Sequence, residues 1–147
     1  MSDNNTNTIT ETEHSAIKER LRSIPIFQTL NYRCDRIGKG EAVFTFPHDK
    51  KFNGIFESFH GGLMMTLADS AASVAVLSLA GADAITTTTD MNIRFLAPCL
   101  TDLTAEAKVI KFGATLCPVS VELRDADGKL VAVAQVTYMR LSKMPRR

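Results

Sequence analysis

The longest hydrophobic stretch of the chain runs from His60 to Ala80. After Gly61 and Gly62 it contains neither Gly nor Pro, it is rich in Ala, Leu and Met, and its only charged residue is Asp69. This composition predicts one α-helix of about five turns. Apolar residues lie on every side of it, so the helix must be buried in protein or in a bilayer. Because Asp69 near its centre would cost about 3 kcal/mol in a bilayer, we expect a helix wrapped by protein and no membrane span.

The segments on both sides of this helix alternate between apolar and polar positions, as half-buried strands do. Two precede the helix around the turn Gly38-Lys39-Gly40, and four follow it. In the first of these four, strict alternation assigns Met91 and Ile93 to one face and Thr88 to the other. In the third, Pro118 predicts an edge position or a β-bulge. The pattern predicts an α+β fold, a curved antiparallel sheet of about six strands wrapped around one long apolar helix. The predicted strands span residues 32–37, 41–46, 86–96, 103–110, 117–124 and 130–141.

A short amphipathic helix is predicted near the N-terminus. Thr10 and Glu13 resemble a capping box, and Pro25 ends the helical pattern, so we expect this helix to pack on the outside of the domain. The domain assignment is a disordered N-terminal tail over residues 1–13, a folded domain over 14–142 and a basic C-terminal tail over 143–147.

Composition limits the class of protein. The chain has 147 residues, of which 45% are hydrophobic and 22% charged, with a net charge of +1. These values indicate one globular domain and give no sign of a nucleic-acid or membrane-surface partner. The three cysteines are far apart and form no C-x-x-C pair, which favours reduced thiols. No basic, apolar signal segment is present at the N-terminus, so we expect a cytoplasmic protein.

The start and the middle of the long helix are candidates for chemistry. The N–H groups of Gly61 and Gly62 lack partners inside the helix, so we expect them to bind an anion or a polarised carbonyl. Asp69 is an ionisable group in an apolar helix, which favours a functional use; the alternative is a bond to a neighbouring backbone group. Asn53 lies in the loop that leads into the helix, where it either faces these donors or forms a turn with Gly54. Four large apolar residues in this loop are expected to cover a site: Phe52, Ile55, Phe56 and Phe59.

Several motifs together resemble one known family. They are His60-Gly61-Gly62, Leu67-Ala68-Asp69, Asn53, Thr89-Asp90-Met91-Asn92-Ile93 and Pro98. This set resembles the hotdog-fold acyl-CoA thioesterases, specifically the PaaI-like branch of phenylacetate degradation. The resemblance implies hydrolysis of a thioester between coenzyme A and an acyl or aryl group. It also implies that the reaction needs no metal or cofactor and that the protein is a homodimer or a dimer of dimers.

The resemblance also suggests roles for individual residues. Asp69 looks like the nucleophile or general base, the Gly61 N–H the donor to the carbonyl, Asn53 the group that orients the thioester or water, and Thr88 a residue that positions the water. Residues expected to line the substrate and coenzyme A site are His60, Gly62, Phe95, Leu96, Ala97, Pro98, Cys99, Lys111, Gly113 and Thr115.

Helix geometry adds a constraint of its own. Gly61 and Asp69 are eight residues apart, which is about 12 Å along a helix axis. A carbonyl bound at Gly61 must lie about 3 Å from its nucleophile, so Asp69 of the same chain cannot attack it. Either Asp69 is unrelated to this carbonyl or it serves one bound by another chain, as in a two-fold dimer with antiparallel helices.

Other readings remain open. A non-catalytic hotdog module could bind acyl-CoA, although it would not need the carboxylate. A hydratase or dehydratase of acyl thioesters would pair a loop histidine with a helix carboxylate, and His48 fits that pattern poorly. Cys99 is an alternative nucleophile. His60 is expected to bond near the helix start, with a general-base role as the alternative.

Overall fold

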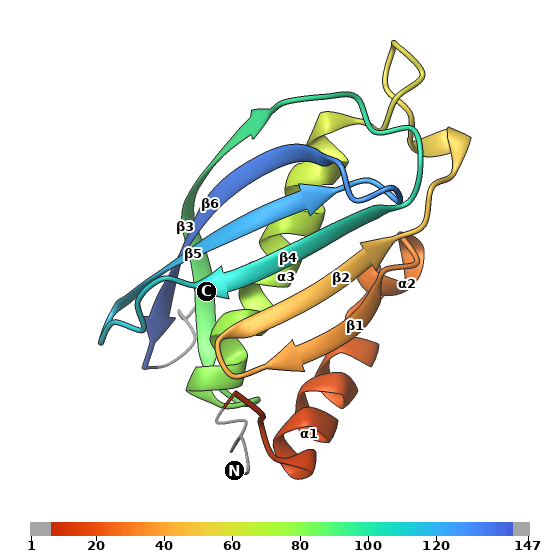
Figure 1. Cartoon of the computed structure of the whole chain (residues 1–147). Helices are drawn as coiled ribbons and strands as arrows, with labels where there is room; N and C mark the ends of the chain where they lie inside the picture. Colours follow the sequence, from red (N-terminus) through yellow and green to blue (C-terminus); the bar gives the residue numbers. More distant parts are fainter. Residues whose placement is uncertain (1–6, 143–147) are drawn as a thin grey trace, which may run out of the picture.

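The computed structural model describes residues 7–142, in which one sheet curves around one long helix (Figure 1). Residues 1–6 of the assigned N-terminal tail and all of the assigned C-terminal tail, 143–147, lie outside the described residues. The elements in chain order are α1 (Glu11–Arg22), α2 (Pro25–Thr29), β1 (Arg33–Gly38), β2 (Glu41–Phe46), the 3-10 turn η1 (Lys50–Phe52), α3 (Gly61–Ala80), β3 (Ile85–Phe95), β4 (Leu103–Val109), β5 (Leu116–Arg124) and β6 (Leu130–Leu141).

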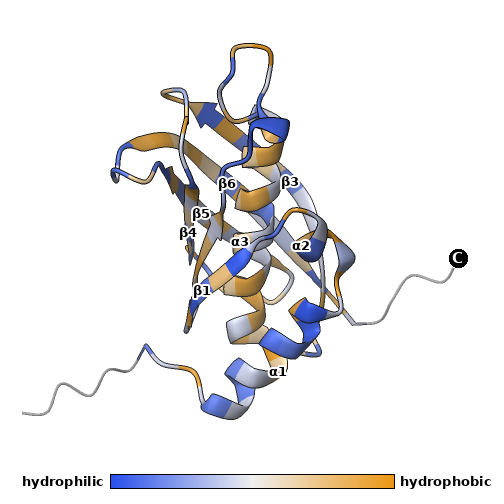
Figure 2. Cartoon of the chain, turned by 90° about the vertical axis from the view of Figure 1, so that its right-hand side faces the viewer, coloured by the Kyte–Doolittle hydropathy of each residue, from blue (hydrophilic) through white to orange (hydrophobic). Residues whose placement is uncertain are grey.

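The predicted architecture is confirmed. All strand pairs are antiparallel, the strand order is β1-β2-β4-β5-β6-β3, and α3 contacts all six strands. Figure 2 shows α3 as a largely hydrophobic helix at the centre and α1 as a mostly hydrophilic one outside it. α3 is long and apolar enough to cross a membrane, but 56% of its most apolar 18-residue window is buried inside the protein. It packs as the core helix against all six strands.

The N-terminal helix begins earlier than the assigned domain boundary. The Thr10 side chain accepts a hydrogen bond from the Glu13 N–H, and the Glu13 carboxylate accepts one from the Thr10 N–H. Because this capping box satisfies two helix-end donors, α1 starts at Glu11. The assignment of residues 11–13 to a disordered tail is therefore wrong. As predicted, α1 packs on the outside, and it buries Ile17 and Leu21.

Pro118 does not mark a sheet edge or a bulge. β5 lies between β4 and β6, and its register is regular at Pro118. In an antiparallel pair the N and O of one residue face the same neighbour, and the Pro118 carbonyl accepts from Ile110, just beyond the end of β4. The side of Pro118 that lacks an N–H therefore faces the chain just beyond the end of β4. No hydrogen bond between β4 and β5 is lost there.

A buried serine ties the β1–β2 turn to the far end of α3. Ser78 accepts a hydrogen bond from the Gly40 N–H at 2.8 Å and donates one to the Ala75 carbonyl at 2.7 Å. Gly40 has a φ of +74°, a conformation that L side chains rarely adopt, so the turn depends on glycine here. This contact fixes the hairpin over the C-terminal half of α3.

We expect Ser78→Ala to lower the free energy of unfolding by about 1–3 kcal/mol, because the buried Gly40 N–H would lose its partner. Urea unfolding followed by circular dichroism measures this change. The exposed Ser120→Ala is the control, with an expected effect within about 0.5 kcal/mol. Equal stability of the two variants would contradict this account of the turn.

Candidate active site

The start of α3 presents one free donor rather than two. His60 is the N-cap, and its Nδ1 accepts a hydrogen bond from the Gly62 N–H at 3.0 Å. The expectation that Gly62 offers a free N–H is therefore wrong, because its donor is used by the cap. The Gly61 N–H has no hydrogen-bond partner among residues 7–142. Since Nδ1 of His60 accepts, it carries no proton, which supports the predicted structural role of this residue.

A cavity of about 350 Å³ lies in front of Gly61. The cavity is lined by Gly61, the predicted carbonyl donor, and by the segment Phe95–Cys99, which was predicted to line the substrate site. Both parts of that segment are anchored: the Leu96 and Ala97 N–H groups donate to the Val131 carbonyl, and the Cys99 carbonyl accepts from Phe59. The other lining residues are Ser58, Phe59 and Met64.

Asp69 is held by two hydroxyl groups. Its Oδ1 accepts hydrogen bonds of 2.8 Å from Thr88 on β3 and from Tyr138 on β6. Tyr138 also donates to the Asp69 backbone carbonyl at 3.0 Å. Burial, and secondly the charge of Asp69, raises the pKa of Tyr138, so its hydroxyl remains a donor. Oδ2 has no hydrogen-bond partner among the described residues, which leaves one carboxylate oxygen available for chemistry.

A β-bulge brings Thr88 to Asp69. The pairing of β3 with β6 is regular up to Thr88 and resumes at Asp90, so Thr89 is an extra residue. An extra residue reverses the facing of every later position, and Thr88 therefore shares its face with Met91 and Ile93. Strict alternation put them on opposite faces, and that prediction is wrong. Thr88 was expected in the site only because of the family resemblance. The bulge turns its side chain toward the Asp69 carboxylate.

A second cavity, of about 210 Å³, contains Asp69 in its wall. Besides Tyr138, its lining comes from one face of α3, from β3 and from the two N-terminal helices. The lining residues are Arg20, Leu21, Ile24, Phe27, Asp69, Ser70, Ser73, Leu77, Thr86 and Tyr138. Gly61 lines one cavity and Asp69 another, as expected for groups eight residues apart on one helix.

Asn53 lies beside the helix start, but its side-chain oxygen is already engaged. The Asn53 backbone forms an isolated β-bridge with Phe59. The Asn53 Oδ1 accepts a 2.9 Å hydrogen bond from His48 Nε2. Together with Gly54 it lines a third cavity, of about 410 Å³. The structure therefore does not bring the Asn53 amide into the Gly61 cavity.

The loop residues expected to cover a site divide into two pairs. Phe52 and Phe59 pack edge-on against the buried Phe46, with ring centroids 5.0 Å and 4.7 Å away. Ile55 and Phe56 lie at the loop tip and are 90% and 87% exposed. Of the four, only Phe52 and Phe59 therefore cover other side chains of the described structure.

The turn Lys111-x-Gly113-x-Thr115 lies at the opposite end of the sheet from Phe95. Leu116 pairs with Met139 near the end of β6, whereas Phe95 pairs with Ala132 near its start. One chain alone therefore does not bring this turn to the Gly61 cavity, although both were expected to contact coenzyme A.

Cys99 is unsuited to act as a nucleophile. It is 1% exposed, its Sγ donates to the Thr101 carbonyl, and burial raises the pKa of the thiol. A buried thiol of raised pKa contains little thiolate at neutral pH.

Comparison with known proteins decides the family. Residues 56–132 match the family described as the thioesterase superfamily, a span of just over half the chain. The chain belongs to this superfamily. A Saccharolobus solfataricus protein named as an esterase is 35% identical to the thioesterase over 111 residues, covering 74% of this chain and 78% of the relative. Human acyl-coenzyme A thioesterase 13 is 32% identical over 102 residues, covering 67% and 71%.

A solved structure has the same fold. The PaaI protein from the phenylacetic acid degradation operon of E. coli superposes with a TM-score of 0.81 at 23% identity, covering 90% of the thioesterase and 97% of that chain. Together with the observed topology, these findings make this protein a hotdog-fold thioesterase, a hydrolase of thioester bonds.

Sequence reasoning missed Tyr138 as a site residue. It lies in an alternating strand whose inner face is apolar, and an inward phenol needs a hydrogen-bond partner when buried. The sequence could therefore have indicated that the Tyr138 hydroxyl has a hydrogen-bond partner. Which residue is near it became clear only from the pairing of Thr88 with Tyr138 across β3 and β6.

We expect Tyr138→Phe to lower the kcat of the thioesterase roughly 10- to 100-fold, because a hydrogen bond to a charged group contributes about 1.5–3 kcal/mol. Release of free thiol measures kcat. Tyr32→Phe is a matched control, since the buried Tyr32 hydroxyl has no hydrogen-bond partner within residues 7–142. A Tyr138→Phe enzyme as fast as Tyr32→Phe would remove Tyr138 from the site.

Proposed function

We propose that the protein hydrolyses acyl-CoA or aryl-CoA thioesters, with Asp69 as nucleophile or general base and the Gly61 N–H as donor to the carbonyl. The observation that carries this proposal is Asp69, whose Oδ1 is held by two hydroxyls while Oδ2 has no partner among the described residues. The human relative is an acyl-coenzyme A thioesterase by name, which supports the same substrate class.

The chemistry has two possible routes. In the first, Oδ2 attacks the thioester carbonyl, the C–S bond breaks, the thiolate leaves, and water hydrolyses the resulting mixed anhydride. In the second, Asp69 takes a proton from water, the hydroxide formed attacks the carbonyl, the C–S bond breaks, and the thiolate leaves with the free acid as the other product. In both, the Gly61 N–H stabilises the developing oxyanion, an effect of about 3–4 kcal/mol in comparable sites. Neither route requires a metal or cofactor, and coenzyme A enters only as part of the substrate.

We infer a homodimer, alone or paired as a dimer of dimers, whose sites are shared between chains. Gly61 and Asp69 are about 12 Å apart along one helix, too far for one chain to act on a single carbonyl. β3 is an edge strand of 11 residues, and its outer side pairs with no described strand. Such an edge is a template for pairing with a second copy.

Two-fold pairing of β3 with its copy would reunite the separated groups. An axis near the middle of β3 makes the two α3 helices antiparallel and lays the Phe95 end of one strand beside the Ile85 end of the other. Gly61 adjoins the Phe95 end, with the ring 3.0 Å from where a Gly61 Cβ would stand. Asp69 and the turn at Gly113 belong to the other half of the sheet, so each would approach the partner subunit's Gly61 cavity.

The hydratase alternative gains no support from the histidines. His48 bonds Asn53 and His60 accepts from the Gly62 N–H as the cap of α3, so within one chain both ring nitrogens that could act are engaged away from Asp69. A non-catalytic module would not need the carboxylate with its two hydroxyl donors. We therefore retain the PaaI-like thioesterase function, in a cytoplasmic protein.

We expect Asp69→Asn to reduce thioester hydrolysis at least about 100-fold while acyl-CoA binding persists, because the amide cannot attack or take a proton. The amide oxygen can still accept from Thr88 and Tyr138, so the fold should be kept. Thiol release measures turnover, and calorimetry with acyl-CoA measures binding. The exposed Asp83→Asn is the control. Full turnover by Asp69→Asn would exclude Asp69 from the mechanism.

Mixed dimers test whether sites are shared. Gly61→Pro removes the donor, and proline is tolerated at the first position of a helix. Gly61→Ala is its control, because it keeps the N–H while adding the same Cβ, 3.0 Å from the Phe95 ring. A heterodimer of Gly61→Pro with Asp69→Asn is expected to regain about half of wild-type activity. A heterodimer of wild type with the double variant should be inactive. The reverse result for the two heterodimers would show that each site lies within one chain.

A further inference from the structure

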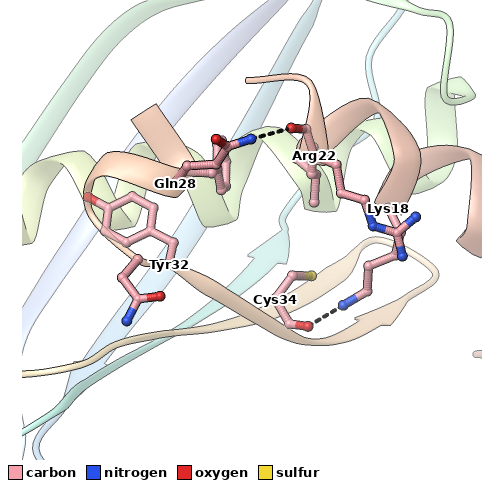
Figure 3. Close-up of a pocket in the computed structure, with 8 residues that line it drawn as sticks. Lys18, Arg22, Gln28, Tyr32 and Cys34 are labelled. Carbon is pink, nitrogen blue, oxygen red and sulfur yellow. Dashed lines mark hydrogen bonds between the residues drawn. The ribbon is translucent and has the colours of Figure 1, made fainter. Parts of the chain in front are cut away.

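Two cavities lie beneath the N-terminal helices, on either side of Phe27 and Leu21. The inner one contains Asp69 and measures about 210 Å³, and the outer one measures about 300 Å³. Phe27 and Leu21 line both, so their side chains form a shared wall. Figure 3 shows the outer cavity, with Lys18 bonded to the Cys34 carbonyl and Gln28 to the Arg22 carbonyl.

The inner cavity follows one face of α3 away from Asp69. Ser70, Ser73 and Leu77 line it at helical spacing, and Asp69 and Leu77 are about 12 Å apart along the helix axis. Hydroxyl groups surround the end near Asp69. Leu21, Ile24 and Phe27 form an apolar roof, and Arg20 and Thr86 also line the cavity. This arrangement suits a group whose carbonyl lies at Asp69 and whose hydrocarbon part packs against the apolar roof.

The two helices of the roof are held differently. α1 is anchored by Ile17 and Leu21 in the core and by Arg20, which donates to the carbonyls of Ala82 and Ala84. α2 has five residues, no side-chain hydrogen bond at its N-cap and no buried residue. Phe27 is therefore the part of the shared wall that the rest of the fold constrains least.

We propose that Phe27 sets the length limit of the acyl group, with the outer cavity as the space that it closes off. This inference rests on the proposed thioesterase function and specifies the substrate class within it. A straight chain advances roughly 1.2 Å per bond, so roughly 8 to 10 carbons span the distance from Asp69 to Leu77, both of which line the inner cavity. Each cavity alone is at or below the low end of ligand sites, about 300–1,000 Å³, and the two joined fall within that range.

The outer cavity offers space for a longer acyl chain. Its wall combines the apolar side chains of Leu21, Phe27 and Tyr32 with the stems of Lys18 and Arg22. The Lys18 ammonium donates to the Cys34 carbonyl, and the Arg22 guanidinium is exposed and pairs with Glu19. A smaller side chain at position 27 would join the two spaces. Longer acyl chains would then pass from the Asp69 end beneath α2 without changing the reacting groups.

The test is the chain-length profile of Phe27→Ala. With straight-chain acyl-CoA substrates from butanoyl to hexadecanoyl, we expect wild type to prefer chains up to about ten carbons. In Phe27→Ala, the ratio of kcat/KM for hexadecanoyl to octanoyl should rise at least tenfold. Ile26→Ala is the matched control, because Ile26 is the adjacent residue of α2, is 46% exposed and lines neither cavity.

Two further variants keep the test decisive if Phe27→Ala folds poorly, since Phe27 packs against Phe44 and Tyr32. Phe27→Leu should shift the profile part of the way toward long chains, and Phe27→Trp should shift it toward short ones. An unchanged profile in all folded variants would overturn the proposal while leaving thioester hydrolysis intact. Failure of wild type to hydrolyse any acyl-CoA would instead refute the proposed function.

Discussion

Burial of a helix that has no polar face is the constraint on which the rest of this structure depends. α3 buries ten of its residues, and each large apolar side chain so buried contributes about 1.5–3 kcal/mol. A flat sheet would cover one side of such a helix only. The six strands therefore curve around α3, and α1 covers part of what the sheet leaves open.

The same burial decides how a carboxylate can exist inside the protein. A charge in this helix would be costly without hydrogen bonds, and Asp69 receives two on one oxygen, from β3 and β6. A rigid helix also fixes the separation of its parts. The donor at Gly61 and the carboxylate at Asp69 therefore belong to different cavities of one chain, and a two-fold partner is the simplest arrangement that unites them.

The N-terminal helices combine two roles for the same reason. Leu21 completes the core over α3, yet it also lines the cavity that begins at Asp69. α1 is anchored by Arg20 to the loop after α3, whereas Phe27 of α2 packs against Phe44 and Tyr32 and also lines that cavity. Packing of the core and shape of the candidate acyl pocket thus depend on the same few side chains.

The sequence by itself determined which secondary-structure elements make up this fold. The apolar run after Gly62 has no polar face, and the strands around it alternate, so a wrapped helix and six strands follow from periodicity alone. The candidate carboxylate and the donor at Gly61 were also identified, because a lone charge in an apolar helix and a helix start are both visible in sequence. The eight-residue spacing also led to the expectation that, if both groups act on one carbonyl, they come from two chains.

Only the tertiary structure decided which partners these groups have. Strict alternation could not reveal the bulge at Thr89, since a bulge depends on how β3 pairs with β6, and without it Thr88 would face away from Asp69. Tyr138 was missed because its partner lies 69 residues away in the chain. The engagement of Gly62 by His60 and of Asn53 by His48 depends likewise on side-chain directions. Periodicity specifies which face a residue occupies, whereas hydrogen-bond partners are set by contacts between elements that are distant in sequence.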